Sequence, residues 1–513
     1  MKTLLSTLSI LFFCIFFTAC NEKNEPHAST ITKEEPIQNT LYDKPKNIKQ
    51  EENLKTKDKQ LQTTSKITKE DTKVIEKKVE PKWYPKQTIQ RKSTTVSKNT
   101  IKNFDFNIIK KGFKDDNTLL IIGGIQGDEP GGFMAASLIA THYEIKKGSV
   151  WIVPNLNFYS IIKRSRGPYG DMNRKFANLS KNDPEYESVQ RIKNYIKDED
   201  VKLVVNLHDG SGFYRPTYID KMHSPYRWGQ CSIIDQSKID AKKYSNLKDI
   251  SLKVVDHVNK SLIKKEHIYH LHNTRTNEGD KEMEKTLTYF AINQGKAAFG
   301  NEASKSLPTH QRTYYHLLAL EKFMDIMGIE YERKFNLNDQ VVKNIIDNDI
   351  EISIYDDKIK LPLSKVRNFI NYFPVKDDGT IDFVPSNPLM SIVKKHNEYI
   401  IYYGNRRLSK LKADYIPLAK EKTTAKLKID SKLKEIKFGS VVNVKKDFLV
   451  LPKENYRVNV IGYTNKSKIE TNIKITQKKM KKRFSIDKTG STYRVEFYTK
   501  NKFAGMILVK FTS

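Results

Sequence analysis

The stretch that decides the fold is TLLIIGGIQGDEPGG, residues 118–132. Its first seven residues form a short apolar run, which is typical of a strand buried on both faces. The glycine-rich turn that follows leads into a helical pattern over residues 132–143. Because a buried strand that turns directly into a helix opens a βαβ unit, this stretch predicts an α/β domain.

The alternation of apolar runs and helical patterns continues as far as residue 327. Further strands are expected at residues 149–153, 201–207 and 297–300, and further helices at residues 184–196, 249–262, 285–293 and 310–327. After residue 333 the long helical patterns stop, and short runs of alternating hydrophobicity replace them. We therefore predict an α/β domain followed by two small all-β domains, the second with the spacing of a sandwich.

The chain divides into five predicted segments. These are a signal peptide (1–20), a disordered polar tether (21–101), the α/β domain (102–331), a barrel-like β domain (332–423) and an immunoglobulin-like β-sandwich (424–513). The tether is rich in Lys, Glu, Thr, Gln and Asn, with almost no aromatic residue before Trp83. Such a composition buries too little apolar surface to offset chain entropy.

The amino-acid composition excludes some classes of protein and favours others. The 513 residues are 38% hydrophobic, which excludes wholesale disorder and allows more than one core. Lys and Arg number 91 against 60 Asp and Glu, a net charge of +31 that favours an anionic partner. The three cysteines, Cys14, Cys20 and Cys231, are too few for a disulfide framework.

Residues 1–20 indicate export. Lys2 is followed by an uncharged run over residues 3–19, which is too short and one-sided for a comfortable membrane span. The run ends in FTAC, which resembles a bacterial lipoprotein processing box, although Phe17 replaces the usual leucine; Cys20 would then be acylated. An uncleaved anchor or an ordinary secretory signal are the alternatives. All of them place the protein outside the cytoplasm, so we expect a periplasmic lipoprotein tethered to a membrane by its N-terminus, and no nucleic-acid partner.

Three polar side chains at predicted strand ends are candidate metal ligands. Gln126 and Glu129 are three residues apart in the turn after the first strand, which lets both oxygens converge on one ion. His208 follows the strand over residues 201–207. Open parallel sheets place ligands at this edge, and catalytic zinc takes three protein ligands and one open position. A lone Gln-x-x-Glu also fits an ordinary turn whose carboxylate starts a helix.

Two further stretches place arginine and carboxylate side chains at the same edge of the predicted sheet. The loop RSRGPYGDMNRKF, residues 164–176, contains Arg166 and the Asn173-Arg174 pair, and the rigid fork of arginine matches carboxylates and polarised carbonyls. Glu302 comes just after the strand over residues 297–300. A carboxylate there is suited to act as a general base on water at a metal.

The order of these elements resembles the zinc metallocarboxypeptidase family over roughly residues 102–331. That family shows His-x-x-Glu after a strand, an Arg, an Asn-Arg pair, a His after a strand and a late catalytic Glu. The resemblance implies a carboxypeptidase-like mixed sheet flanked by helices, one catalytic zinc ion with Glu129 and His208 as ligands, and Glu302 as the general base. Gln126 replaces the family's first histidine. This substitution, with two β domains after the catalytic one, looks like the peptidoglycan DL-carboxypeptidases that shape helical and curved bacterial cells.

The resemblance also implies which residues hold the substrate. Arg166 matches the arginine that polarises the scissile carbonyl, and Asn173 with Arg174 matches the clamp on the terminal carboxylate. Thr288 lies where the family closes a late loop over the substrate. Trp228, in a long insertion, is a candidate wall of the pocket, although an ordinary buried or surface aromatic is the alternative.

The implied substrate is an uncrosslinked muramyl tripeptide, L-Ala-γ-D-Glu-meso-diaminopimelate. Removal of the terminal diaminopimelate gives a dipeptide and thereby affects cell shape. The partner is then a peptidoglycan muropeptide, whose many carboxylates suit a basic protein. The oligomeric state is left open.

Two other classes of function remain. DMNRKF, residues 171–176, also resembles the Asp-Leu-Asn-Arg-x-Phe of aspartoacylase-like zinc deacylases, although the signal sequence argues against them. The other class is a non-catalytic muropeptide-binding lipoprotein in which Gln126 marks loss of the metal. The presence of Glu302, Arg166 and Arg174 argues for catalysis.

Overall fold

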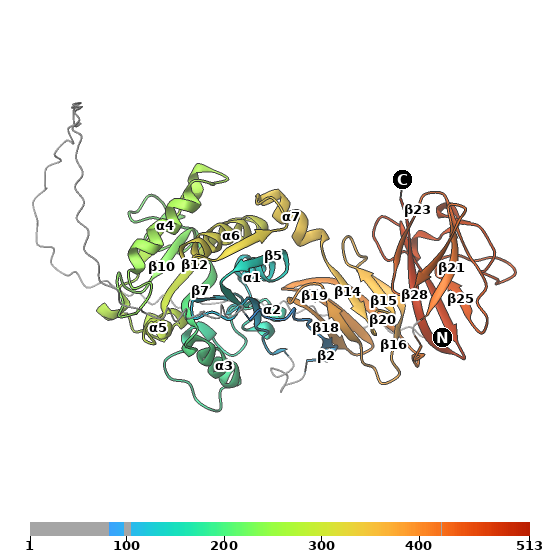
Figure 1. Ribbon diagram of the computed structural model, residues 1–513, viewed down its shortest axis with the longest axis horizontal. Coiled ribbons are helices and arrows are strands. Elements are labelled where there is room, and N and C mark those ends of the chain that lie inside the picture. The colour runs from blue at the N-terminus through green and yellow to red at the C-terminus, as the bar shows by residue number, and fades with distance from the viewer. Residues whose placement is uncertain (1–81, 97–103, 422, 513) are drawn as a thin grey trace, which may run out of the picture. The chain divides into compact units, whose positions relative to one another are not determined.

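The structure is a computed structural model that describes residues 82–96, 104–421 and 423–512 (Figure 1). The predicted signal peptide with Cys20, and the predicted tether over residues 21–81 and 97–101, lie outside these ranges. Within them, every helix is too short or too polar to cross a bilayer.

A seven-stranded mixed sheet forms the centre of the first domain. Its order is β11 (His270–Asn273), β10 (Cys231–Ile234), β12 (Ala297–Ser304), β7 (Val201–Gly210), β4 (Thr118–Ile122), β6 (Ser149–Val153) and β3 (Ile109–Gly112). The four strands from β12 to β6 run parallel, whereas β3 and β10 are antiparallel to their inner neighbours. All residues of β4, β6 and β12 are buried, as their apolar runs predict for strands covered on both faces.

Helices cover both faces of this sheet (Figure 1). On one face lie α1 (Pro130–His142), α4 (Leu247–Asn259) and α6 (Thr309–Ile326), and α6 contacts both of the others. On the other face lie α3 (Tyr186–Lys197) and α5 (Leu287–Ile292). A Cβ at Gly132 would lie 2.8 Å from the Leu207 carbonyl oxygen, so α1 packs closely on β7 only because this position is glycine.

The predicted strands and helices of the α/β domain are confirmed, with small shifts at their ends. After residue 333, where the long helical patterns stop, the sequence analysis did not predict one further helix. Helix α7 (Asp339–Asn348) begins with the Asn338 side chain accepting a hydrogen bond from the Val341 amide, and it buries Val342, Ile345 and Ile346 against the rest of the fold. Its apolar stripe is only ten residues long, too short to stand out among the neighbouring alternating runs.

The middle domain is built from two sheets that each include a strand from far upstream in the sequence. One sheet has the order β1 (Arg91–Lys92), β17 (Asp382–Pro385), β14 (Glu351–Ile354) and β15 (Ile359–Pro362). The other has the order β16 (Phe369–Val375), β20 (Arg406–Tyr415), β19 (Glu398–Tyr403), β18 (Met390–Lys395) and β2 (Thr94–Thr95).

The prediction of a disordered tether is therefore wrong for residues 82–96. β1 pairs with β17 and β2 pairs with β18, both as two-residue strands at a sheet edge. Trp83 also bridges to Phe113, with the ring centroids 5.4 Å apart. Edge strands this short take polar residues, so composition alone did not distinguish them from a tether.

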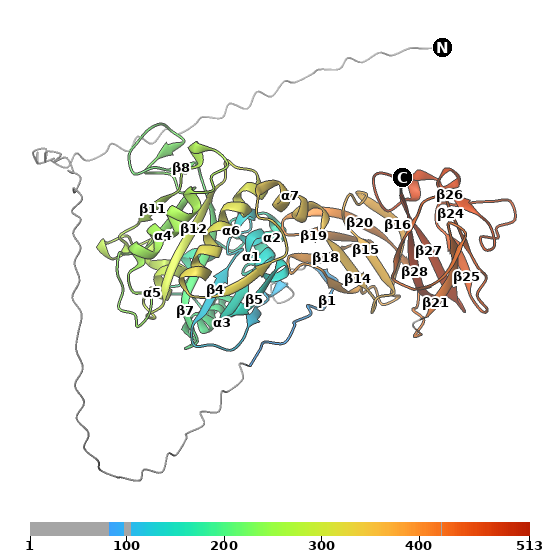
Figure 2. The same cartoon turned by 45° about the horizontal axis from the view of Figure 1, so that its top comes forward.

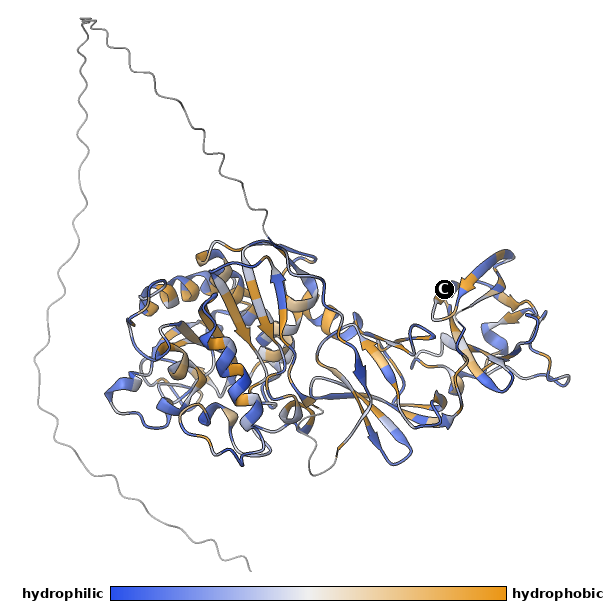
Figure 3. Ribbon diagram, turned by 60° about the horizontal axis from the view of Figure 1, so that its bottom comes forward, coloured by the Kyte–Doolittle hydropathy of each residue, from blue (hydrophilic) through white to orange (hydrophobic). Residues whose placement is uncertain are grey.

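The C-terminal domain is a sandwich of two four-stranded sheets, as predicted (Figure 2). The sheets have the orders β22 (Lys432–Lys437), β21 (Thr424–Ile429), β24 (Asp447–Val450), β26 (Ile475–Thr476), and β23 (Val441–Val444), β28 (Lys502–Phe511), β27 (Thr492–Thr499), β25 (Arg457–Val460). Most buried apolar residues of this domain form a core of their own. A few, such as Tyr498, Phe503 and Met506, instead join the core that the α/β and middle domains share. Figure 3 shows hydrophobic residues along strands and hydrophilic residues on outer loops.

Arg91 joins the upstream segment to both of the larger domains. Its guanidinium donates hydrogen bonds to the Asn107 side chain of the α/β domain and to the Pro388 carbonyl of the middle domain, the latter at 2.8 Å. It also lies 4.7 Å from the centre of the Phe158 ring. Burial lowers the pKa of Arg91 to about 10, so the side chain is still charged at neutral pH.

We expect Arg91→Met to lower the free energy of unfolding by about 2–3 kcal/mol, because two buried acceptors lose a charged donor. Denaturant unfolding measures this change. Lys92→Met is the matched control, since the neighbouring Lys92 side chain is 79% exposed, and it should change stability by less than about 0.5 kcal/mol. Equal stability of both variants would show that Arg91 does not anchor the segment.

Candidate active site

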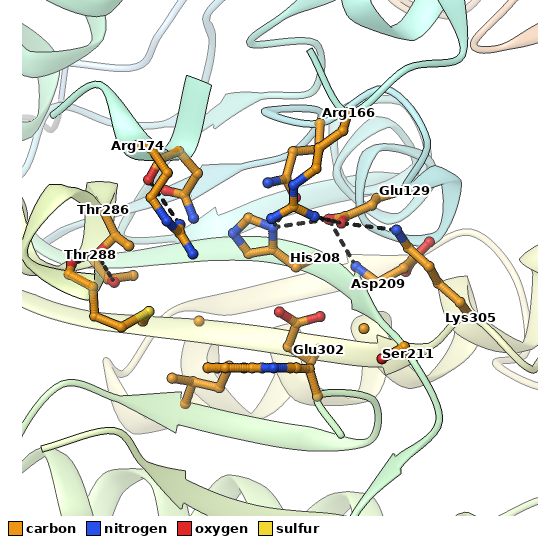
Figure 4. Close-up of a pocket in the computed structure, with 17 residues that line it drawn as sticks. Glu129, Arg166, Arg174, His208, Asp209, Ser211, Thr286, Thr288, Glu302 and Lys305 are labelled. Atoms are coloured by element: carbon orange, nitrogen blue, oxygen red, sulfur yellow. Dashed lines mark hydrogen bonds and ion pairs between the residues drawn. The ribbon is translucent and has the colours of Figure 1, made fainter. Parts of the chain in front are cut away.

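One pocket lies at the carboxyl ends of β4, β7 and β12 and has a volume of about 310 Å³ (Figure 4). Every predicted site residue within the described part of the chain lines it: Gln126, Glu129, Arg166, Asn173, Arg174, His208, Trp228, Thr288 and Glu302. Cys20 lies outside the described residues. Side chains separated by up to 176 positions in the sequence therefore meet in one cavity.

Three candidate ligand atoms lie close together: Gln126 Oε1, Glu129 Oε2 and His208 Nδ1. His208 Nδ1 lies 3.2 Å from Gln126 Oε1 and 3.0 Å from Glu129 Oε2. Tetrahedral bonds of about 2.0–2.2 Å imply ligand separations of about 3.3–3.6 Å, so both distances from His208 Nδ1 are close to those around a zinc-sized ion. Within the described chain, no group of three or more His, Cys, Asp and Glu side chains could hold a metal, so the Gln126 amide oxygen is needed to complete this set.

Asp171 fixes the orientation of Gln126. The Gln126 Nε2 group donates a hydrogen bond to Asp171 Oδ1 at 2.7 Å, which turns Oε1 toward Glu129 and His208. The other oxygen of Asp171 accepts from Arg166 Nε and Nη2 at 3.0 and 2.9 Å. Burial alone would raise the pKa of Asp171, but the Gln126 hydrogen bond and the Arg166 charge lower it below its usual value. The carboxylate thus stays charged and orients a candidate ligand.

Asn206 contacts the other ring nitrogen of His208. Its Nδ2 atom lies 2.8 Å from His208 Nε2, while its Oδ1 atom is buried without a hydrogen-bond partner. A 180° rotation of the amide exchanges these two atoms and pairs the orphaned oxygen with an Nε2–H donor. The lone pair of Nδ1 then points toward Gln126 and Glu129, as a metal ligand requires.

Asp209 caps helix α1 and leaves Glu129 free. Although Glu129 is the N-cap residue of α1, its side chain makes no cap hydrogen bond. Instead Asp209 Oδ2 accepts from the Gly131 amide at 2.8 Å and from Arg312 at 2.9 Å. Glu129 Oε2 accepts from the Asp209 amide at 3.1 Å, which fixes the carboxylate toward His208.

Glu302 lies beside His208 because the two residues are register partners on β12 and β7. Its side chain is buried, and its Oε2 atom has no hydrogen-bond partner. Burial raises the pKa of Glu302 well above its usual value, and the negative charges of Glu129 and Asp209 add to this effect. A bound cation would oppose that shift. An orphaned carboxylate oxygen in a pocket is suited to exchange a proton with a substrate or a water.

The Asn173-Arg174 pair forms a donor surface on another side of the pocket. Asn173 Oδ1 accepts a hydrogen bond from the Leu287 amide at 3.0 Å, so its Nδ2 group is the one available to a ligand. Arg174 Nη1 donates to the Asn173 carbonyl at 3.2 Å, and the nearest carboxylate to its Nε is Glu282, at 3.8 Å. These donors suit a carboxylate.

Contacts with neighbouring side chains position Trp228 and Thr288 at the pocket. The Trp228 ring lies 4.9 Å from the His272 ring, centroid to centroid. Thr288 is buried, with its hydroxyl 3.2 Å from that of Thr286, the N-cap residue of α5.

Sequence reasoning missed several residues of the site. Lys305 lines the pocket and binds Asp128 at 2.8 Å and Glu129 at 3.3 Å, and Asp171 orients Gln126 as described above. The signals were weak but present: Asp171 lies two residues before Asn173, and Lys305 follows Glu302 by three. Asp209, which caps α1, is a further residue of this pocket.

Comparison with known proteins identifies the family. A family model described as "Carboxypeptidase controlling helical cell shape catalytic" matches residues 92–347. Models described as "beta-barrel domain of carboxypeptidase M99" and "C-terminal domain of metallo-carboxypeptidase" match residues 347–417 and 418–512. The chain belongs to this family of carboxypeptidases. The domain boundaries predicted above, at residues 331 and 423, stay predictions.

Solved structures agree with this family of cell-shape carboxypeptidases. The apo cell shape determinant protein Csd4 from Helicobacter pylori is 42% identical, with a TM-score of 0.73, and the match covers 80% of this chain and 100% of that chain. Its tripeptide-bound form gives 42% identity, a TM-score of 0.72 and the same coverage. An mDAP-bound form, described as a D,L-carboxypeptidase, gives 41% identity, a TM-score of 0.71 and coverage of 82% and 100%. No curated protein sequence matched.

We expect Asp171→Ala to weaken metal binding by about 10- to 100-fold, because the Gln126 amide loses the acceptor that aims its oxygen at the site. Competition with a chromogenic chelator measures the affinity without an activity assay. Asp171→Asn retains an acceptor oxygen and should therefore lose less metal affinity than Asp171→Ala. Asp220→Ala, at a carboxylate that is 54% exposed, is the control. Wild-type affinity in Asp171→Ala would exclude this role for Asp171.

Proposed function

We propose that this carboxypeptidase is a zinc-dependent peptidoglycan D,L-carboxypeptidase that removes the terminal meso-diaminopimelate from uncrosslinked muramyl tripeptide. The observation that carries the proposal is the cluster of Gln126, Glu129 and His208 facing an orphaned Glu302 in one pocket. The tripeptide and mDAP named for the Csd4 structures support the choice of substrate. Loss of the terminal residue from the stem peptide would affect cell shape.

The proposed cofactor is one zinc ion held by Gln126, Glu129 and His208. Three ligands with nitrogen and oxygen donors leave a fourth position open, as in catalytic rather than structural zinc sites. When bound, zinc acidifies water and polarises a carbonyl group.

The side chains of the pocket divide the remaining work of hydrolysis. Asn173 and Arg174 hold the terminal carboxylate of the substrate, which places the scissile amide near Glu302. Glu302 accepts the proton of the attacking water and returns it to the departing amine. Arg166, fixed by Asp171, donates hydrogen bonds to the oxygen that gains negative charge. Trp228 and Thr288 bound the space for the substrate side chain.

The two alternative classes gain no support. Family matches that together span residues 92–512 include both β domains, which places the chain among cell-shape carboxypeptidases rather than deacylases. A non-catalytic binding protein does not explain a buried Glu302 oxygen left without a partner beside an intact set of ligands.

Glu302→Gln should retain zinc and tripeptide binding but lose turnover by about 10²–10⁴-fold, because an amide cannot accept the proton. Mass spectrometry of muropeptide digests measures turnover, and calorimetry measures tripeptide binding. Glu332→Gln, at a carboxylate that is 64% exposed and does not line the pocket, is the control. Substantial turnover in Glu302→Gln would assign the base to another residue.

We also propose that the protein is a periplasmic lipoprotein acylated at Cys20. The uncharged run over residues 3–19 and the FTAC sequence support this. Cys20→Ala should release a soluble, still active enzyme, because acylation is the proposed attachment. Fractionation of cells measures release, and intact-mass analysis of the wild type measures the lipid. A wild-type protein without lipid, together with a Cys20→Ala variant that stays in the membrane fraction, would overturn the assignment.

A further inference from the structure

A second cavity, of about 840 Å³, is lined by residues from the end of α2 (Phe158–Lys163) and from the sheet that contains β2 and β18. Its floor is apolar and is formed by Ile162, Val393, Ile400 and Tyr402. Around this floor stand four exposed cationic side chains, which we call the cationic rim: Lys163, Arg164, Lys395 and Arg407.

The cationic rim is not neutralised by any acidic side chain of the described residues. Within the described ranges, none of its four side chains forms an ion pair, and no acidic side chain lines the cavity. Arg164 donates to the Asn405 carbonyl and Arg407 to the Tyr402 hydroxyl, both neutral acceptors. In the active site, by contrast, Arg166 and Lys305 are both paired with carboxylates. Uncompensated positive charge over an apolar floor attracts an anionic ligand.

A short basic segment joins this cavity to the active site. Lys163 and Arg164 line the cavity, while Arg166, two residues on, lines the active-site pocket. Arg164 adopts the left-handed conformation, with φ of 56°, as the C-cap of α2, so the chain turns between the two cavities. The Asn405 side chain, from the turn between β19 and β20, lies 3.5 Å from the Gly127 carbonyl in the turn that carries Gln126.

We propose that the cationic rim binds carboxylates of the peptidoglycan polymer next to the stem peptide held in the active site. This inference rests on the proposed function and extends it from free muropeptide to the intact polymer. When one stem peptide of the polymer enters the active-site pocket beside Arg166, the adjoining part of the polymer lies near Arg164 and Lys163. The neighbouring stem peptides on that polymer carry carboxylates that the cationic rim can bind. The middle domain, which contributes Lys395 and Arg407, would then be a substrate-binding module rather than a spacer.

The test is a triple variant, Lys163→Gln/Lys395→Gln/Arg407→Gln, which removes charge but retains a polar side chain at each position. Arg164 is left intact because it contacts both domains. Co-sedimentation with purified sacculi should weaken at least about tenfold, and hydrolysis of sacculi should fall with it, because three charges of the rim are lost. Hydrolysis of free tripeptide should stay within about twofold of wild type, since the active-site residues are unchanged.

The matched control is Lys428→Gln/Lys432→Gln/Lys434→Gln, which removes the same charge from exposed positions of the sandwich domain. It should bind sacculi and cleave tripeptide like the wild type. The proposal is overturned if wild type does not sediment with sacculi, if the rim variant sediments like wild type, or if the control loses as much binding.

Two further outcomes separate this proposal from others. In one outcome, the rim variant no longer binds anionic phosphatidylglycerol vesicles, which the wild type binds, but still binds sacculi as the wild type does. The rim then binds a lipid surface and the proposal fails. If wild type does not cleave tripeptide, the proposed function fails, whereas sedimentation with sacculi still decides the role of the rim.

Discussion

The hydrogen-bond register of three parallel strands is the constraint on which the active site depends. β12 pairs with β7 so that Glu302 lies opposite His208, and β4 pairs with β7 so that Ile122 lies opposite Asn206. The turn after β4 then carries Gln126 and Glu129 to the same edge. A slip of one residue along β12 would turn Glu302 to the other face of the sheet, so strand pairing alone decides whether base and ligands share a cavity.

A second constraint is the excess of buried negative charge at that edge. Glu129, Asp209 and Glu302 lie within one pocket, and burial together with the like charges of Glu129 and Asp209 raises the pKa of Glu302. Arg312 pairs with Asp209, and Lys305 with Glu129, but Glu302 keeps an oxygen without a partner. A divalent cation between Glu129 and His208 would relieve this repulsion. The electrostatics of this site therefore favour the cation proposed above.

The sequence predicted most of the α/β fold because its central strands are buried on both faces and read as continuous apolar runs, such as TLLII over β4. It predicted the pocket because its residues lie at strand ends or in one arginine-rich loop. The sequence did not predict features that depend on contacts between residues far apart in the chain. β1 and β2 are polar pairs of residues that become strands only against β17 and β18, and Lys305 gains its position from a contact with Asp128, 177 positions away.

Gln126 and Asp171 show why a motif cannot be interpreted one residue at a time. A neutral amide is a weaker metal donor than imidazole, so Gln126 alone suggests a site that has lost its ion. In the structure its Nε2 group donates to a charged carboxylate, and this hydrogen bond pushes electron density toward Oε1, the atom that faces Glu129 and His208. Asp171 also fixes Arg166, so one carboxylate orients both the proposed metal ligand and the proposed oxyanion donor. The orientation of the Gln126 amide thus depends on residue 171, in a loop 45 positions away, being an aspartate.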